Sequence, residues 1–221
     1  MAAGDFPRLD ILPVAQRRLW PELAAVPEHF ALYGGTGLAL HLGHRASVDF
    51  DLFATSGFDP DALIEQMPFL ADAGVIQRGQ DTLGVIVDRG EPVRLSFFGL
   101  PRLPRLAPPL IAADNGLRVA SLIDLAGTKA SVVQKRSELK DYIDIAALLR
   151  DGQVDLAAAL AAGRALYGAQ FNPQITLKAL TYFDDGNLDR LPASTKDLLV
   201  KAVVSVDLDH LPDIIARQDL L

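Results

Sequence analysis

The sequence predicts an α/β fold: a mixed β-sheet with flanking helices, followed by a C-terminal helical region. In the first half, short apolar runs are separated by turns, and one run alternates apolar and polar residues as a strand does. In the second half, apolar residues recur at helical spacing. The proline-rich stretch PRLPRLAPPL, residues 101–110, lies between the halves. We therefore expect an α/β core over residues 1–115 and a helical region over residues 116–221.

The composition limits the classes of protein to consider. Of 221 residues, 50% are hydrophobic and 22% are charged, which is typical of a packed core and not of disorder. The apolar stretches fall short of the roughly 18 residues that a membrane span needs, and no secretory signal is visible, so we expect a cytoplasmic protein without a membrane partner. The absence of cysteine excludes disulfides and thiolate metal sites. A net charge of −7 argues against broad, nonspecific attachment to nucleic acid.

The first predicted elements lead to the most informative segment. Residues 9–26 predict one or two short helices, with Pro21 near a helix start or a break. HFALYGG, residues 29–35, predicts a short buried strand that ends in glycines. TGLALHLGH, residues 36–44, predicts a helix that Gly43 terminates. ASVDFDLF, residues 46–53, has the period of two that a strand requires, with Val48, Phe50 and Leu52 on its apolar face.

The remaining elements follow in order. Asp59-Pro60-Asp61 predicts the start of a helix that extends to Leu70, because an N-cap residue precedes a proline in the first turn. Three strand-like runs come next, at residues 74–79, 82–90 and 92–100. Beyond the proline-rich loop the sequence predicts helices over residues 121–136, 137–150, 154–168, 173–183 and 194–206.

Two aspartates stand in the alternating strand. Residues i and i+2 of a strand point to the same face, so Asp49 and Asp51 are expected to project side by side. Two adjacent carboxylates repel each other and normally have a cation beside them. Carboxylate oxygens suit Mg²⁺ or Mn²⁺, and Mg²⁺ typically joins one or two protein carboxylates to substrate phosphates. The pair therefore predicts a metal site, and the metal implies phosphates.

A glycine pair precedes these aspartates. Gly34, Gly35 and Thr36 lie at the predicted strand-to-helix turn, where backbone N–H groups and the positive end of a helix can receive an anion. Glycine allows a phosphate to approach the backbone, and the Thr36 hydroxyl can add a hydrogen bond. Leu40 stands where a dinucleotide fingerprint needs its third glycine, and no P-loop motif is present.

The segment GGTGLALHLGHRASVDFDLF, Gly34 to Phe53, resembles the signature of the nucleotidyltransferase AbiEii/AbiGii toxin family, part of the wider nucleotidyltransferase superfamily. The stretch KASVVQKRSELKDYIDIAALL, Lys129 to Leu149, is similar to that family's second signature. The resemblance covers roughly residues 30–150 and implies a nucleotidyltransferase-like sheet. It also implies a set of site residues. These are Asp49 and Asp51 as metal ligands and catalytic residues, Gly34, Gly35, Thr36, Arg45, Ser47, Lys129 and Arg136 at the nucleotide, and Lys129, Asp141 and Asp144 as further catalytic residues.

The second signature also has a physical interpretation. On one continuous helix, Lys129, Arg136 and Lys140 would fall on nearly one stripe, which can face a triphosphate or can be a solvated basic edge. Asp141 and Asp144 border the expected apolar stripe of their helix. They can position Arg45 or Lys129, act as a base, or be ordinary helix-edge acids. The sequence leaves these alternatives open.

One position departs from the superfamily pattern. Many members place a third carboxylate on a later strand, where the strand PVRLSFFGL offers Ser96. Two carboxylates can hold a metal together with substrate phosphates, but a two-metal arrangement is less well supported. Either another acid such as Asp144 compensates, or catalysis is altered or lost. Arg102 and Arg105 in the proline-rich loop either contact a substrate or are ordinary exposed arginines.

The sequence thus predicts an Mg²⁺-dependent nucleotidyltransferase that transfers a nucleoside monophosphate from a nucleoside triphosphate to an acceptor. The resemblance implies the toxin of a toxin–antitoxin or phage-defence system, with tRNA or protein as acceptor and an antitoxin protein as partner. The alternative is a degenerate member that binds nucleotide or a partner without catalysis. A metal-dependent glycosyltransferase leaves the glycine pair unexplained, and a phosphatase with a strand nucleophile would need Ser or Thr soon after Asp51.

Overall fold

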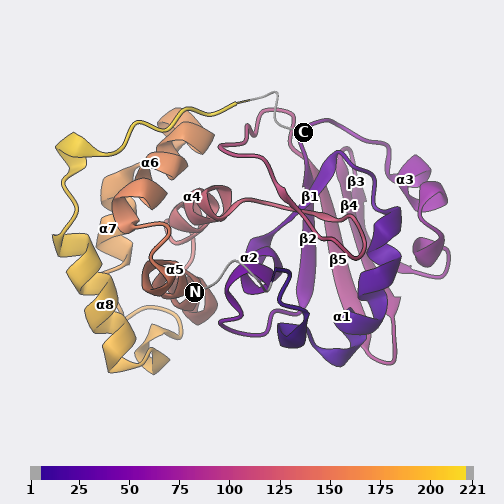
Figure 1. Ribbon diagram of the computed structural model, residues 1–221, viewed down its shortest axis with the longest axis horizontal. Helices are drawn as coiled ribbons and strands as arrows, with labels where there is room; N and C mark the ends of the chain where they lie inside the picture. Colours follow the sequence, from indigo (N-terminus) through magenta and orange to yellow (C-terminus); the bar gives the residue numbers. More distant parts are fainter. Residues whose placement is uncertain (1–5, 218–221) are drawn as a thin grey trace. The chain divides into compact units, whose positions relative to one another are not determined.

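A computed structural model describes residues 6–217 of the chain (Figure 1). By their contacts the described residues form two compact units. The first contains residues 6–104 and 108–121, and the second contains residues 105–107 and 122–217. The division of the chain into independent domains at residues 115/116 stays a prediction.

The first unit contains a seven-stranded mixed sheet within the described residues, with strand order β3-β4-β5-β2-β1-β7-β6. The strands are β1 (Phe30–Tyr33), β2 (Asp49–Ala54), β3 (Gly74–Gly79), β4 (Thr82–Asp88), β5 (Pro92–Gly99), β6 (Leu110–Ile111) and β7 (Arg118–Val119). β2 runs antiparallel to β1 and parallel to β5, and β1 runs parallel to β7. The predicted mixed sheet is confirmed. The sequence did not indicate the two-residue strands β6 and β7.

Helical segments cover the sheet of the first unit. They are η1 (Leu9–Ile11), α1 (Val14–Leu19), η2 (Trp20–Ala25), α2 (Gly34–Leu42), α3 (Pro60–Gln66) and η3 (Pro68–Leu70). In Figure 1, α2 lies on one side of the sheet and α1 and α3 lie on the other. The main core combines Trp20 and Leu63 with Phe50 and Phe97 of the sheet, each of which is buried. Helices therefore lie on both sides of the sheet, and β2 and β5 contribute Phe50 and Phe97 to the core.

Local signals set the ends of two of these helices. The Asp59 carboxylate accepts hydrogen bonds from the N–H groups of Asp61 and Ala62, and Pro60 occupies the first turn of α3. Gly43 ends α2 in the left-handed region, with φ of 60°. The predicted end of α2 and the predicted start of α3 are confirmed, but α3 ends at Gln66, before Pro68, and does not extend to Leu70.

The second unit is helical. Its elements are α4 (Leu122–Val132), α5 (Leu139–Asp151), α6 (Leu156–Tyr167), η4 (Gly168–Gln170), α7 (Pro173–Ala179), η5 (Leu188–Arg190), α8 (Ala193–Val204) and η6 (Leu208–His210). Tyr142, Leu160, Leu180 and Leu199 lie in its own buried core. The predicted C-terminal helical region is confirmed. Within residues 6–217, no helix combines the length and the apolar character needed to cross a bilayer.

The prediction of one continuous helix, with Lys129 and Arg136 on one stripe, is wrong. The chain turns between Val132, where α4 ends, and Leu139, where α5 begins. Adjacent β-branched valines weaken the helix at its end. The distant residue Asn187 then accepts a hydrogen bond from the Leu139 N–H at 2.7 Å, which stabilises the new helix start. The Lys129–Arg136–Lys140 stripe does not form.

The proline-rich loop is anchored to the second unit. The backbone of Arg105 exchanges two hydrogen bonds with that of Arg217, at 2.8 and 2.7 Å. The buried Asp124 carboxylate accepts hydrogen bonds from the N–H groups of Leu106 and Ala107. The interpretation of Arg105 as an exposed loop arginine is wrong, since Arg105 is buried and its backbone pairs with a residue that is distant in the sequence.

Candidate nucleotide site

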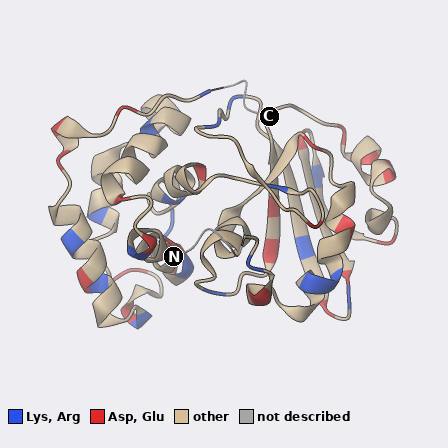
Figure 2. Cartoon of the chain, in the orientation of Figure 1, with Lys and Arg blue, Asp and Glu red and all other residues tan. Residues whose placement is uncertain are grey.

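Asp49 and Asp51 lie on one face of β2 and are partly exposed, while Phe50 and Leu52 between and beyond them are fully buried. Figure 2 shows acidic positions in red on this strand. The side-by-side carboxylates predicted from the alternation are confirmed. Val48 is the exception: it is 62% exposed and precedes the strand, so its predicted burial is wrong. The alternation of buried and partly exposed side chains holds only from Asp49, where β2 begins to pair with its neighbouring strands.

The glycine pair makes room for the polar groups of the site. Gly34 has φ of +67°, a conformation that favours glycine, and a β-carbon there would collide with the Asp51 carboxylate. A β-carbon on Gly35 would lie 2.7 Å from Arg45 Nη2 and 2.9 Å from Ser47 Oγ. The first turn of α2 is thus closely approached by Asp51 on one side and by Arg45 and Ser47 on the other.

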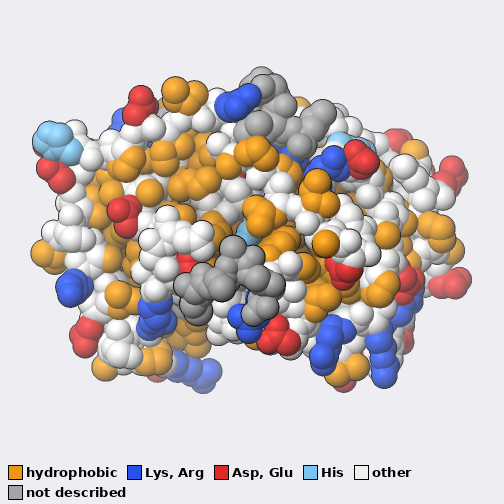
Figure 3. Space-filling model, in the orientation of Figure 1, with side chains coloured by type: hydrophobic (Ala, Val, Ile, Leu, Met, Phe, Trp, Pro, Cys, Tyr) orange, Lys and Arg blue, Asp and Glu red, His pale blue; other side chains and the backbone are white. Residues whose placement is uncertain are grey.

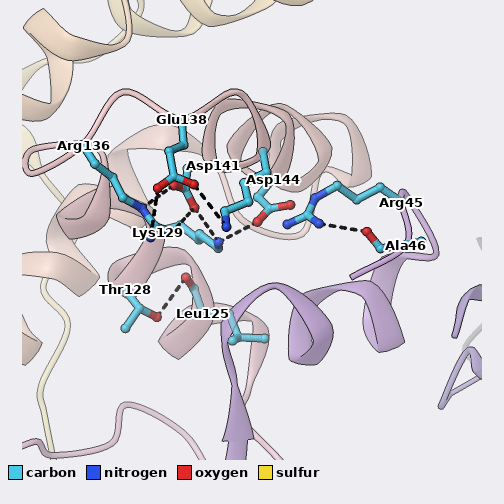
Figure 4. Close-up of polar contacts among 10 residues, drawn as sticks. Arg45, Ala46, Leu125, Thr128, Lys129, Arg136, Glu138, Asp141 and Asp144 are labelled. Carbon is cyan, nitrogen blue, oxygen red and sulfur yellow. Dashed lines mark hydrogen bonds and ion pairs between the residues drawn. The ribbon is translucent and has the colours of Figure 1, made fainter. Parts of the chain in front are cut away.

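Thr36 has a different role from the predicted one. Its buried hydroxyl donates a hydrogen bond to the backbone oxygen of Asp49 at 2.5 Å, which ties α2 to β2. The hydroxyl proton is therefore engaged within the protein, and Thr36 remains a predicted phosphate ligand only through its backbone N–H. The Arg45 guanidinium donates to the backbone oxygen of Ala46 at 2.9 Å (Figure 4).

Ser96 occupies the position next to the aspartates. On β5 it is in register with Asp51, and on its other side it pairs with Gly84 of β4. It is 5% exposed. Among residues 6–217, no group of three or more His, Cys, Asp or Glu side chains is arranged to hold a metal ion. Two carboxylates fit a single Mg²⁺ that is shared with substrate phosphates and water, because Mg²⁺ usually takes only one or two protein carboxylates.

The second unit contains a network of buried ion pairs (Figure 4). Lys129 of α4 lies 2.9 Å from Asp141 Oδ1 and 2.6 Å from Asp144 Oδ2, both on α5. Arg136 donates to Asp141 from Nε at 2.8 Å. Lys129 is 6% exposed and both aspartates are 0% exposed. The prediction that the aspartates border the apolar stripe is wrong, because the lysine of a neighbouring helix compensates their charge in the interior.

The pKa of Asp141 reflects these partners. Burial raises it, but the hydrogen bond from Arg136 and the charge of Lys129 outweigh burial, so the net pKa lies below the ordinary value of 3.8. A general base is most effective when its pKa is near the operating pH. Of the roles that the sequence left open, the geometry therefore supports the positioning of Lys129 by Asp141 over proton abstraction.

The family follows from comparison with known proteins. The family described as "Nucleotidyl transferase AbiEii toxin, Type IV TA system" matches residues 18–214. The chain belongs to this family. An uncharacterized protein of Aquifex aeolicus, aq_aa25, is 32% identical over 158 residues, which cover 71% of this chain and 74% of that protein. The chain is therefore a member of a nucleotidyltransferase family whose toxins act in type IV toxin–antitoxin systems.

Solved structures show the same fold at low identity. The nucleotidyltransferase toxin MenT4 of Mycobacterium tuberculosis is 17% identical with a TM-score of 0.60, and the match covers 91% of this chain and 85% of MenT4. A putative nucleotidyltransferase of H. pylori is 16% identical with a TM-score of 0.53, and the match covers 92% and 93% of the two chains. The predicted nucleotidyltransferase-like fold is confirmed.

Within this AbiEii family member, the predicted site residues fall into two sets. Each unit holds one set. The first unit holds Gly34, Gly35, Thr36, Arg45, Ser47, Asp49 and Asp51, and the second holds Lys129, Arg136, Asp141 and Asp144. Sequence reasoning did not place Arg94 and Phe98 near the aspartates; they flank Ser96 on the same face of β5. The alternation of PVRLSFFG was the available signal.

Replacing Gly34 with alanine is expected to destabilise the first unit by about 1–3 kcal/mol, because the β-carbon adds strain at positive φ and displaces Asp51. Urea unfolding measures this loss. Gly79→Ala is the matched control, since a β-carbon there meets nothing within 4 Å. Equal stability of the two variants would contradict the close approach of Gly34 and Asp51.

The lowered pKa of Asp141 predicts that the stability of the protein depends on pH. Because its pKa is lowered on folding, its stabilising contribution is complete above the unfolded-state value of 3.8 and is lost as the pH falls through the lower folded-state value. Urea unfolding between about pH 2 and pH 6 should show a shallower decline at the acid end for Asp141→Asn than for the wild type. Asp197→Asn, which changes an exposed carboxylate of α8, should follow the wild-type curve. Parallel curves for Asp141→Asn and the wild type would refute this linkage.

Proposed function

We propose that this protein uses Mg²⁺, or Mn²⁺, to transfer a nucleoside monophosphate from a nucleoside triphosphate to a hydroxyl of an acceptor. The observation that carries the proposal is the position of Asp49 and Asp51 beside the first turn of α2, where Gly34 approaches the Asp51 carboxylate. The two carboxylates suit a hard cation, and the N-terminus of α2 suits a phosphate. Both lie in the first unit. Membership of a nucleotidyltransferase family supports this reading.

The residues of the first unit have distinct proposed roles. Asp49 and Asp51 hold the cation, which when bound neutralises charge on the phosphates. The backbone N–H groups of the first turn of α2 receive a phosphate, and the helix dipole favours its negative charge. Arg45 and Ser47 lie against Gly35 and extend the polar surface around this turn.

In the second unit, Lys129 and Arg136 stay predicted ligands of the triphosphate. A lysine ammonium has three N–H donors, and Lys129 Nζ makes one contact with Asp141 and one with Asp144. We assign these aspartates to positioning: they fix the lysine side chain and compensate its charge. Removing either carboxylate is therefore expected to act through Lys129.

The proposed acceptor and partner rest on membership of the family. A tRNA or a protein is the proposed acceptor, and an antitoxin protein the proposed partner, because the family is described by its type IV toxin–antitoxin systems. The proposed location is the cytoplasm. Charged side chains of both signs are dispersed among hydrophobic ones on the face shown in Figure 3, so recognition of a nucleic acid would depend on a few local contacts.

The test uses purified full-length protein and each of the four nucleoside triphosphates, labelled at the α-phosphate. Incubation with total RNA or with a protein extract should transfer label to one of them in Mg²⁺ and not in EDTA. Triphosphates labelled at the γ-phosphate should transfer nothing, because that phosphate leaves with pyrophosphate. Transfer that continues undiminished in EDTA would overturn the metal-dependent mechanism.

A second candidate, a degenerate member without catalysis, rests on Ser96 in register with Asp51 where a third carboxylate would stand. It predicts that nucleotide binds but that no label reaches RNA or protein under any condition. The labelling experiment therefore separates the two candidates.

A further inference from the structure

The helix that begins at the glycine turn is tied at both ends to backbone carbonyls of other segments. In the first turn of α2, Thr36 donates a hydrogen bond to the backbone oxygen of Asp49 at 2.5 Å. In the last turn, His41 Nε2 lies 2.8 Å from the backbone oxygen of Ala120, a residue 79 positions away in the sequence. Because a carbonyl oxygen has no proton to donate, Nε2 carries the proton and is the donor.

Ala120 uses both of its backbone polar groups to contact the two elements that flank the glycine turn. Its N–H donates to the backbone oxygen of Leu32 in β1 at 2.9 Å, and its carbonyl accepts from His41 of α2. β1 ends at Tyr33 and α2 begins at Gly34, so the glycine turn joins these two elements directly. Ala120 is 2% exposed, so water has little access to either bond. We refer to the two bonds as the Ala120 clamp.

The Ala120 clamp comes immediately before the second set of predicted site residues in the chain. α4 begins at Leu122, two residues after Ala120, and carries Lys129. Ser121 is the last residue of the segment 108–121 that belongs to the first unit. A displacement of β1 or α2 at the glycine turn therefore reaches the start of α4 through the backbone of Ala120.

The N-terminal segment packs against the same end of α2. The Phe6 ring lies against the imidazole of His41, with ring centroids 4.9 Å apart. The N–H of Arg8 donates to the backbone oxygen of Leu40 at 2.9 Å. His41 is partly buried by this packing. The imidazole is therefore held in place, with its donor directed at Ala120.

We propose that His41 is a positioning residue for the binding of a nucleoside triphosphate. Its hydrogen bond to Ala120 fixes the last turn of α2, and through the helix it fixes the direction of the backbone N–H groups in the first turn. The same bond holds the backbone that leads into α4. This role rests on the proposed function, in which the first turn of α2 receives a phosphate. His41 acts through the helix, because it lies seven residues, or roughly 10 Å along the axis, from Gly34.

Two amide substitutions that differ by one methylene test the bond. The amide of glutamine can place a donor near the position of His41 Nε2, whereas the amide of asparagine is too short to reach Ala120. His41→Asn should raise KM for the nucleoside triphosphate about tenfold, because the buried carbonyl of Ala120 loses its donor, and should leave kcat within about twofold. His41→Gln should keep KM within about twofold of the wild-type value.

The separate effects on KM and kcat distinguish positioning from a purely structural role. A smaller fraction of folded protein lowers the apparent kcat and leaves KM unchanged. His29→Asn is the matched control, since His29 is a partly buried histidine of the same unit that lies outside α2. This variant should keep the wild-type KM.

Calorimetric binding of a non-hydrolysable triphosphate in Mg²⁺ gives a readout that is independent of transfer. Binding about tenfold weaker in His41→Asn than in His41→Gln supports the role of His41, and equal affinities overturn it. A wild type that shows this difference from His41→Asn but transfers no label refutes the proposed nucleotidyl transfer and not the role of His41. A wild type that binds no triphosphate overturns both.

Amide hydrogen exchange without nucleotide tests the Ala120 clamp by itself. Exchange in a peptide that covers residues 116–123 should be at least about fivefold faster in His41→Asn than in His41→Gln, because the bond from Ala120 to Leu32 loses its support. A peptide that covers residues 60–67, in α3, should exchange equally in both variants. Equal exchange of residues 116–123 in the two variants would overturn the clamp.

Discussion

Asp51→Asn is expected to reduce the rate of nucleotidyl transfer by at least about 1,000-fold, because a neutral amide cannot replace a carboxylate ligand of Mg²⁺ and several kcal/mol of charge stabilisation are lost. Asparagine has nearly the same shape as aspartate, so the close packing against Gly34 is preserved and the fold should be retained. The measurement is the initial rate of label transfer at saturating nucleotide. Asp49→Asn is expected to behave in the same way, because the two carboxylates share one face of β2.

Asp72→Asn is the matched control for these variants, since it neutralises an exposed carboxylate of the same unit that lies outside β2. It should retain the wild-type rate. Circular dichroism and urea unfolding establish that the Asp51→Asn protein is folded. A folded Asp51→Asn variant with a wild-type rate would exclude this residue from the metal site.

Lys129→Met is expected to lower the free energy of unfolding by about 3–5 kcal/mol, a large part of the stability of an ordinary domain. The substitution leaves the fully buried carboxylates of Asp141 and Asp144 without the ammonium that lies within 2.9 Å of both. Arg136 still contacts Asp141 and compensates part of its charge. Urea unfolding at neutral pH measures the change.

Two further variants make this prediction specific. Lys178→Met removes an exposed lysine of α7 and should change the stability by no more than about 0.5 kcal/mol. Adding Asp141→Asn and Asp144→Asn to Lys129→Met removes the two buried carboxylate charges that Lys129 compensates in the wild type and should recover most of the lost stability. If Lys129→Met were as stable as Lys178→Met, the buried ion pairs would not hold α4 and α5 together.

The parts of the fold that depend on neighbouring residues in the chain were predictable. The alternation around Asp49 and Asp51 fixes which face each side chain takes, and Gly43 and Asp59 set helix ends through their own backbone and side chains. These signals act over two to four residues, so the sequence contains all the information that they need.

The remaining features depend on partners that are distant in the sequence. The break after Val132 uses a cap from Asn187, and the burial of Asp144 depends on a lysine of another helix. The bond from Thr36 to the backbone of Asp49 requires the actual packing of helix on strand. A helical pattern alone gives no information about these partners, and for this reason it predicts one continuous helix where the structure has α4 and α5.

Strand β5 shows a third situation. The alternation of β5 was visible in the sequence, but its importance depends on which strand lies beside it. Only the pairing with β2 brings Arg94 and Ser96 next to Asp49 and Asp51. Sheet order, and not composition, therefore determines which residues lie beside the two aspartates.

The most direct test of the central claim is a calorimetric titration of Mg²⁺ in the presence of a non-hydrolysable triphosphate, with wild type, Asp49→Asn and Asp51→Asn compared. With two carboxylates on β2 and Ser96 in the neighbouring position, we expect one cation to bind per wild-type chain and both variants to bind it at least about tenfold more weakly. Wild-type affinity for Mg²⁺ in both variants would contradict the assignment of the metal site to Asp49 and Asp51.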